Sequence, residues 1–242
     1  MDRISNIDYC IRYLMQQGGV GERVPDTLHE KQLLLRALMN VWEPQPLSPE
    51  FLEAQDAELQ AQLNDKRIVE NVGNLWQGDI TRLKVDAIVN AANSQGLGCW
   101  HPLHSCIDNA IHSAAGLQLR QACNDILRGR LINTGDAIIT HGYNLPAKWV
   151  IHTVGPIIRH SVPTLEEELQ LVQCYRSCLR LAEEQGCRSI AFCCISTGEF
   201  HFPNRRAAEI AVETCRDTRL KVVFNVFKDT DYDIYRQLLN KG

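Results

Sequence analysis

The segment VDAIVNAAN, residues 85–93, joins a short apolar run to a polar loop. The run is rich in β-branched residues, which is typical of a strand covered on both faces of a sheet. The asparagines that follow favour a turn and can both donate and accept hydrogen bonds. Similar runs recur downstream, namely GDAIITH (135–141), WVIHTV (149–154), SIAFCCIS (189–196) and LKVVFNVF (220–227).

Helical patterns separate these runs, at residues 105–128, 164–186, 204–217 and 230–240. Strands that alternate with helices predict an α/β fold in which helices cover both faces of a central sheet. Ligands of such folds bind in loops that leave the carboxyl ends of the strands. Two loops best fit that position, NAANSQGLGCW (90–100) and STGEFHFPN (196–204).

The first seventy residues have a different organisation, and we expect an N-terminal helical extension over residues 1–70, followed by a second domain over 71–242. Ile4, Ile7, Ile11 and Leu14 recur at helical spacing. Thr27 and Ser48 are candidate N-caps of two further helices, the second with Pro49 at its first position. No chemical motif stands out in this part of the sequence.

Composition limits the classes of function. The net charge of −4 at pH 7 argues against a nucleic-acid partner. No apolar run approaches the roughly eighteen residues of a membrane span, and the start MDRISNIDYC lacks the pattern of a signal peptide. We therefore expect a cytoplasmic protein whose ten cysteines form no disulfide framework. Most of these cysteines should be small buried hydrophobes.

The loop at 196–204 suits a diphosphate. Gly198 permits close approach of the backbone, Ser196 and Thr197 offer hydroxyls, and Pro203 begins a helix whose free N–H groups favour an anion. An ordinary turn between a strand and a helix would have the same composition. The loop alone does not decide between these alternatives.

The stretch GCWHPLHSCIDNAIH, residues 98–112, concentrates cysteine and histidine. Zinc in proteins is held by these side chains in tetrahedral geometry, and a catalytic site keeps one position open. Cys99, His104 and Cys106 supply three ligands from one turn, which predicts one zinc ion per chain. His101 and His112 are substitutes or a fourth ligand. The alternatives are buried cysteines beside exposed histidines, or a nucleophilic cysteine, for which no partner pair stands out.

Taken together, the segments resemble the macrodomain, an ADP-ribose-binding module, over about residues 72–242. The resemblance rests on GDIT (78–81), VDAIVNAAN (85–93), IDNAIHSAAG (107–116), TGDAIITHGYNLP (134–146), VIHTVGP (150–156) and ISTGEFHFPN (195–204). It implies a three-layer α/β/α fold with a central mixed sheet. In the common hydrolase branch, the segment after NAAN is glycine-rich and ends in a valine–aspartate–glycine step. The cysteine and histidine found here instead resemble the zinc-dependent microbial branch.

The resemblance also implies a set of binding residues. Asp79 would accept a hydrogen bond from the adenine amino group, assisted by the backbone of Ile80, unless it only caps a turn. Asn90 and Asn93 would orient the distal ribose, with Asn93 the better candidate and Asn90 open to a structural role. The diphosphate would lie against Ser196, Thr197, Gly198, Glu199 and Phe200. Phe227 would stack on adenine, although the alternation of its strand equally allows a core position.

Asp108 is the position with two interpretations. It corresponds to the aspartate that holds or activates water in the common hydrolase branch, and we assign it and Asn93 to catalysis. Ser105 and Asp108 also form the S-x-x-D pattern of a capping box, and Asp108 could serve as the partner of a ligand histidine. His112, four residues further on, is expected to pack rather than react.

The function that the resemblance implies is a zinc-dependent hydrolase that removes mono-ADP-ribose from aspartate or glutamate side chains of proteins. The zinc would polarise or anchor the ribose, or activate water. We expect a monomer with ADP-ribose as product and a modified protein, with a lipoyl-carrier protein as one candidate, as substrate. Two alternatives are a binding module that does not cleave ADP-ribose and a zinc deaminase, whose H-x-E and P-C-x-x-C elements are missing.

Overall fold

The computed structural model describes residues 2–21 and 23–240 and contains one six-stranded sheet. The strands are β1 (Leu75–Gln77), β2 (Ala87–Ala91), β3 (Ala137–His141), β4 (Trp149–Thr153), β5 (Ser189–Phe192) and β6 (Lys221–Val226). Their order across the sheet is β1-β6-β5-β2-β4-β3. Neighbouring strands run parallel except β3, which pairs antiparallel with β4 at one edge. The predicted mixed sheet is therefore confirmed.

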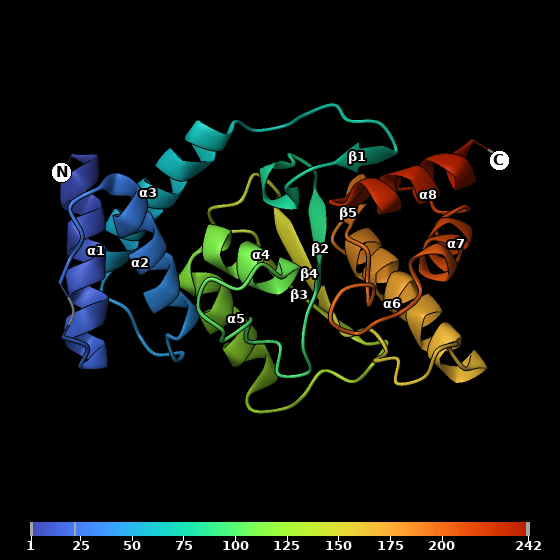
Figure 1. Ribbon diagram of the computed structural model, residues 1–242, viewed down its shortest axis with the longest axis horizontal. Coiled ribbons are helices and arrows are strands. Elements are labelled where there is room, and N and C mark those ends of the chain that lie inside the picture. Colours follow the sequence, from blue (N-terminus) through green and yellow to red (C-terminus); the bar gives the residue numbers. More distant parts are fainter. Residues whose placement is uncertain (1, 22, 241–242) are drawn as a thin grey trace.

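Helices cover both faces of this sheet. The helices α4 (Ile107–Ala115) and α5 (Leu117–Leu127) lie on one side, and α6 (Leu165–Glu184), α7 (Asn204–Thr214) and α8 (Asp229–Leu239) lie on the other (Figure 1). Ile88, Val150 and Ile190 on the central strands are fully buried between these layers. The three-layer α/β/α architecture is confirmed. Within the described residues, each helix is either too short or too polar to cross a lipid bilayer.

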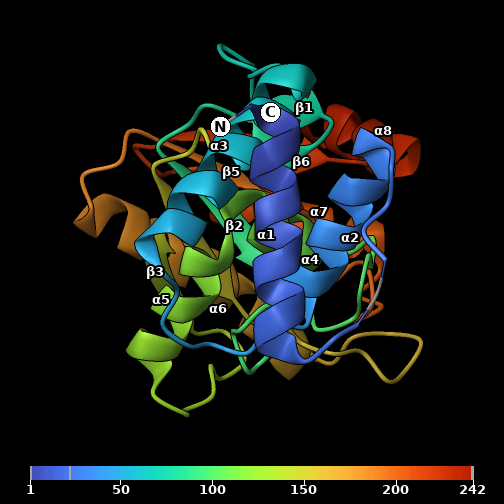
Figure 2. The ribbon, with the colours of Figure 1, turned by 90° about the vertical axis from the view of Figure 1, so that its left-hand side faces the viewer.

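Three helices precede the sheet, α1 (Arg3–Gly18), α2 (Leu28–Asn40) and α3 (Pro49–Lys66). Thr27 and Ser48 cap α2 and α3, as their sequence patterns predicted. Figure 2 shows α1 outermost, with α2 and α3 behind it on either side. Apolar residues of the three helices, such as Ile7 and Phe51, form a core of their own. We call residues 2–66 the extension.

The extension packs directly against α4 and α5 rather than standing apart. Leu117 at the start of α5 is buried in the core of the extension. The Gln55 side chain accepts a hydrogen bond from the backbone N–H of Leu117 at 2.9 Å. Asp56 accepts one from Asn144 at 2.6 Å. The two parts of the chain therefore share an interface that has both apolar and polar contacts. The domain boundary expected at residue 70 stays a prediction.

Two features of the helical layer differ from the sequence analysis. The single helix predicted over 105–128 is two helices, because Gly116 has φ +98° and breaks the pattern. The N-cap of α4 is Cys106, whose sulfur accepts from the Asn109 N–H, so the predicted Ser105 capping box is wrong. The strand β1 was not predicted, because three residues are too few to show a period.

Candidate functional site

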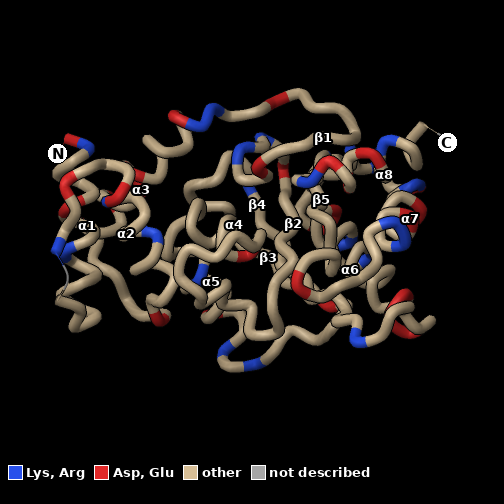
Figure 3. Tube along the Cα trace, viewed as in Figure 1, with Lys and Arg blue, Asp and Glu red and all other residues tan. Residues whose placement is uncertain are grey.

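A cavity of about 870 Å³ opens at the carboxyl ends of the parallel strands. The loops after β1, β2, β5 and β6 contribute to it, as expected for an α/β fold. Its opposite wall comes from the extension, through α2 and α3 residues that include Gln32, Arg36 and Gln62. Acidic and basic residues are interspersed over the molecule (Figure 3), so a ligand here is held by local geometry rather than by a broad field of one sign.

One end of the cavity is lined by Asp79, Ile80 and Phe227. Asp79 accepts hydrogen bonds from the N–H and hydroxyl of Thr81 at 3.0 and 2.6 Å, so it does cap the short turn η1 (Ile80–Arg82). Burial alone would raise the pKa of Asp79, but the Thr81 hydrogen bonds and the Lys66 charge at 3.3 Å outweigh it and lower the pKa. Phe227 is 78% exposed, so the core alternative for it is wrong.

Asp108 lines the cavity and is held by two amides. Asn90 donates to one carboxylate oxygen at 2.7 Å and Asn93 to the other at 3.3 Å. Burial raises the pKa of Asp108 to about 6, although the Asn90 hydrogen bond and the Arg120 charge oppose this. Asn93 and Asp108 line the cavity, whereas Asn90 is fully buried behind them. This buried position agrees with a structural role for Asn90, which the sequence analysis left open.

Asn93 also organises the loop that follows β2. Its side-chain oxygen accepts from the N–H groups of Gln95 and Gly96 at 3.0 and 3.2 Å. Its amide nitrogen donates to the Gly98 carbonyl at 3.0 Å, immediately before Cys99. One asparagine therefore connects the Asp108 carboxylate to the start of the cysteine and histidine loop.

Two buried histidines stand behind Asp108, and the sequence analysis missed the role of one of them. The Asn90 amide lies 3.1 Å from Nδ1 of His152. Because the amide nitrogen donates, Nδ1 accepts, and the ring proton sits on Nε2, 3.0 Å from the Thr140 hydroxyl. Burial lowers the pKa of His152 to about 3, so the ring is neutral. The IHT segment carries no pattern that would reveal this network.

His112 packs beside these groups, as the sequence analysis expected. It is 4% exposed, its ring lies 5.6 Å from that of His152, and its Nε2 lies 3.5 Å from Asp108. His112, Cys123 and His152 form one of two clusters in the described residues whose atoms are close enough to share a metal ion. Both nitrogens of His152 are already engaged by Asn90 and Thr140, so a metal ion held by this residue would displace one of these hydrogen bonds.

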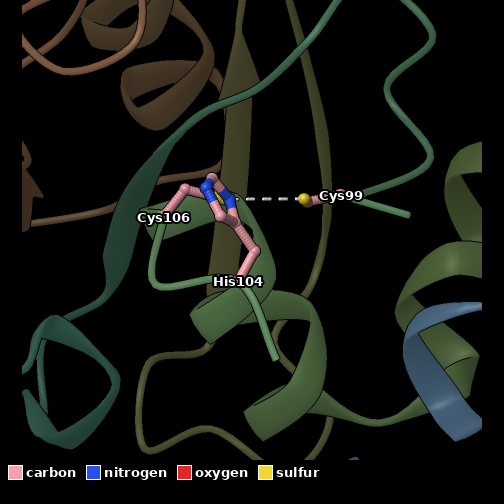
Figure 4. A group of neighbouring side chains, drawn as sticks. All are labelled: Cys99, His104 and Cys106. Carbon is pink, nitrogen blue, oxygen red and sulfur yellow. Dashed lines mark hydrogen bonds between the residues drawn. The ribbon is translucent and has the colours of Figure 1, made fainter. Parts of the chain in front are cut away.

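The second cluster is Cys99, His104 and Cys106, whose ligand atoms lie within 4.8 Å of one another. Figure 4 shows the Cys99 sulfur facing Nδ1 of the His104 ring, and the two atoms are 3.6 Å apart. Zinc bonds of about 2.3 Å to sulfur and about 2.1 Å to nitrogen, at a tetrahedral angle, separate the ligand atoms by about 3.6 Å. The Cys99 and His104 ligand atoms therefore have the separation that two zinc ligands need, and a ligand atom of Cys106 lies within 4.8 Å of both. His101 is not in this cluster.

The pKa of Cys106 bears on the nucleophilic-cysteine alternative. Burial raises the pKa of Cys106 to about 12, so without a cation this thiol is protonated. A protonated thiol is a poor nucleophile, which weakens that alternative for Cys106. Both cysteines and His104 are only partly buried and line the cavity, so a ligand in the cavity can reach them. The donor set fits a zinc site with an open position.

The loop after β5 brings all five predicted residues, Ser196 to Phe200, to the cavity. Ser196 has φ +65°, and its hydroxyl lies against Gly155, where a Cβ would come within 1.9 Å of it. The Thr197 hydroxyl donates to the Cys194 carbonyl at 3.0 Å. Glu199 approaches Nε2 of His104 at 3.9 Å. The loop after β5 therefore reaches the cysteine and histidine stretch of residues 98–112.

A mixed sheet between helical layers, with one large cavity at the carboxyl ends of its parallel strands, defines an α/β/α ligand-binding domain. The Macro domain family model matches residues 89–211, and the chain belongs to this family. A relative from Treponema medium named Protein-ADP-ribose hydrolase is 48% identical over 98% of this chain and 98% of its own length. Another of that name, from Staphylococcus aureus strain MRSA252, is 48% identical over 90% of this chain and 88% of its own.

Solved structures show the same relationship. A macrodomain of Oceanobacillus iheyensis with ADP is 38% identical and has a TM-score of 0.62, covering 71% of this chain and 93% of that one. A Trypanosoma brucei macrodomain in complex with ADP-ribose is 28% identical, also with a TM-score of 0.62, and covers 90% of this chain and 97% of that one. Both share the fold of this protein.

Proposed function

We propose that this protein is a zinc-dependent hydrolase that removes mono-ADP-ribose from aspartate or glutamate side chains of modified proteins. The observation that carries the proposal is the Cys99, His104 and Cys106 cluster on the same cavity as Asp108. Relatives named Protein-ADP-ribose hydrolase support the reaction class. A lipoyl-carrier protein stays a candidate substrate.

The cavity has a suitable group for each part of ADP-ribose. Adenine would lie between Ile80 and the exposed ring of Phe227, with its amino group on Asp79, whose lowered pKa keeps it an acceptor. The diphosphate would lie on the loop from Ser196 to Phe200. The distal ribose would then reach Asn93 and Asp108, with its anomeric carbon towards the cysteine and histidine cluster.

Asp108 is suited to hold and deprotonate a water molecule. With a pKa of about 6 it is ionised at neutral pH, yet it is a better proton acceptor than an ordinary aspartate. The Asn90 and Asn93 amides fix both oxygens, which limits the directions from which water can bind. Zinc bound at Cys99, His104 and Cys106 would act as a Lewis acid on the ribose or on the ester bond.

The proposed reaction needs only modest assistance. The oxygen of water forms a bond to the anomeric carbon, and the bond from that carbon to the protein carboxylate breaks. The carboxylate leaves with the bonding electrons, and it is a stable leaving group. Asp108 receives the water proton and returns it to solvent. Glu or Asp is thereby restored on the substrate protein, and ADP-ribose is released.

The proposal is tested with a protein that carries ADP-ribose on aspartate or glutamate. Release of free ADP-ribose is followed with zinc-loaded protein and with protein whose metal has been removed by a chelator. We expect release by the first, loss in the second and recovery when zinc is added back. Tight binding of ADP-ribose without any release would instead indicate the binding module. Full release after verified metal removal would contradict zinc dependence.

Replacement of Asp108 by Asn removes the proton acceptor and keeps the shape of the side chain. We expect turnover to fall by a factor of about 100 or more, with little change in ADP-ribose affinity, because general base catalysis contributes about this much. Single-turnover release measures the first and calorimetric titration the second. Asp125→Asn, an exposed position on α5, is the control. Equal loss in both variants would remove the catalytic assignment.

A further inference from the structure

One arginine of the extension, Arg36, makes hydrogen bonds to the cysteine and histidine loop. Arg36 lies on α2, on the wall of the cavity. Its Nη2 donates to the backbone carbonyl of His104 at 3.0 Å. Nε and Nη2 also donate to the side-chain oxygen of Asn109 at 3.1 and 2.7 Å. A residue 68 positions earlier in the sequence thus contacts the backbone of a proposed zinc ligand directly.

Asn109 extends this contact to the rest of the loop. Its side chain is fully buried and donates to the His101 carbonyl at 3.0 Å. Its backbone N–H donates to the Cys106 sulfur at 3.4 Å. Hydrogen bonds of the latter kind orient a thiolate and stabilise its charge. Arg36 therefore fixes the side chain of a residue whose backbone touches a second proposed ligand.

A second residue of α2 supports the turn between the ligands. The side-chain oxygen of Asn40 accepts from the N–H of Leu103 at 3.0 Å, and its amide donates to the Ser113 hydroxyl at 2.9 Å. Leu103 has φ +59°, a left-handed conformation that is unfavourable for a residue with a Cβ. Contacts from the extension thus hold a strained turn in the conformation that orients His104.

We propose that Arg36 is a positioning residue for zinc binding, and that the extension is part of the metal site rather than a separate recruiting module. The planar guanidinium donates to two groups at once and so fixes the His104 backbone relative to α4. The His104 ring is thereby kept with Nδ1 towards Cys99. This inference rests on the proposed zinc site and concerns what makes that site competent.

The test compares Arg36→Ala and Arg36→Lys with the original protein. Arg12→Ala is the control, because Arg12 is an exposed arginine of the same extension. Zinc affinity is measured by competition with a chromogenic chelator. We expect Arg36→Ala to bind zinc about 10- to 100-fold more weakly, as is usual for partners of ligand residues. Arg36→Lys keeps one donor group, so its zinc affinity should lie between those of Arg36→Ala and the original protein. The zinc affinity of Arg12→Ala should match that of the original protein.

A spectroscopic measurement separates positioning from general destabilisation. Cobalt bound by two cysteines and a histidine absorbs strongly in tetrahedral geometry, and we expect the Arg36→Ala spectrum to weaken and shift while that of Arg12→Ala is unchanged. If Arg36→Ala does not fold, Arg36→Lys carries the same test. Unchanged zinc affinity and cobalt spectrum in the Arg36 variants would overturn this inference alone. Failure of the original protein to bind zinc would overturn the proposed metal site as well.

Discussion

Asn90 shows why a buried amide stands next to the proposed base. Both hydrogens of its side-chain amide are used, one on Asp108 and one on His152. A buried carboxylate without donors would be strongly destabilised in its charged form. The neutral His152 ring fixes the amide, and Thr140 in turn fixes the ring. Three buried residues thus hold the carboxylate while contributing no atoms to the cavity wall.

The buried His152 predicts a loss of stability in acid. Its pKa is about 3 in the folded protein but near 6.5 in an unfolded chain, so the unfolded state binds the extra proton between these values. The contribution of His152 to the free energy of unfolding is fully present above about pH 6.5. It declines as the pH falls towards 3, by up to about 1.4 kcal/mol per pH unit. His112, whose pKa burial also lowers, acts in the same direction.

Urea unfolding between about pH 4 and pH 7, in the presence of a chelator, measures this effect. We expect His152→Gln to reduce the dependence of the unfolding free energy on pH, because the variant lacks one group that takes up a proton when the chain unfolds. His160→Gln, at an exposed position, should follow the original protein. A slope that is the same in all three proteins would show that His152 titrates normally in the folded state.

The junction of α4 and α5 depends on Gly116. Its φ of +98° and ψ of 171° lie in a region that is almost restricted to glycine. A Cβ there would come within 2.8 Å of the Gln55 amide and 2.6 Å of the Gln118 side chain. These side chains belong to the interface between the extension and α5. The glycine therefore both turns the chain and admits the extension.

Gly116→Ala should lower the free energy of unfolding by about 3 kcal/mol, because backbone strain and steric displacement add. Gly129→Ala is the matched control. Gly129 also has a positive φ, +78°, but a Cβ there would meet no neighbouring atom within 4 Å, so about 1 kcal/mol is expected from strain alone. Chemical denaturation of both variants gives the difference. Equal losses would mean that Gln55 and Gln118 simply move aside.

At the level of elements, the sequence predicted what local patterns encode. The apolar runs became β2 to β6, and Thr27 and Ser48 cap the helices that their patterns indicated. The pattern failed where a structure depends on distant partners. The short strand β1 is stabilised by its pairing with β6, and Gly116, where the predicted helix breaks, lies against Gln55 of the extension.

The candidate site was predictable to a similar degree. The cysteine and histidine loop, the Ser196 loop and Asp108 are local motifs, and all of them line one cavity. Arg36 and Lys66 could not be predicted to reach it, because the sequence does not encode how the extension packs in any local pattern. The same holds for His152, which appears in the sequence only as one residue of a buried strand.

Across the whole molecule, the extension and the sheet domain form one continuous body. Arg120, which is 3% exposed, donates to the carbonyls of Met39 and Trp42 in the extension and to that of Leu97 in the loop after β2. Burial lowers its pKa to about 10, so it remains charged at neutral pH. A buried cation whose hydrogen-bond acceptors come from both parts couples their stabilities.

This coupling predicts that the chain unfolds in one transition. Two variants that retain only Trp42, in the extension, or only Trp149, on β4, report on the two parts separately when the other tryptophans are replaced by Phe. We expect their urea midpoints to coincide, because separation would expose Leu117 and remove two of the three carbonyl acceptors of Arg120. A Trp42 transition at clearly lower urea would show that the extension is an independent unit.

The pairing of β1 with β6 also has a kinetic consequence. It joins Leu75 to Phe224, so nearly 150 residues lie between the partners, and contacts this distant in sequence form slowly because a large loop must close first. Asp79 follows β1 and Phe227 follows β6, and together they make one end of the cavity. The capacity to recognise a nucleotide should therefore arise among the last events of refolding, after most secondary structure has formed.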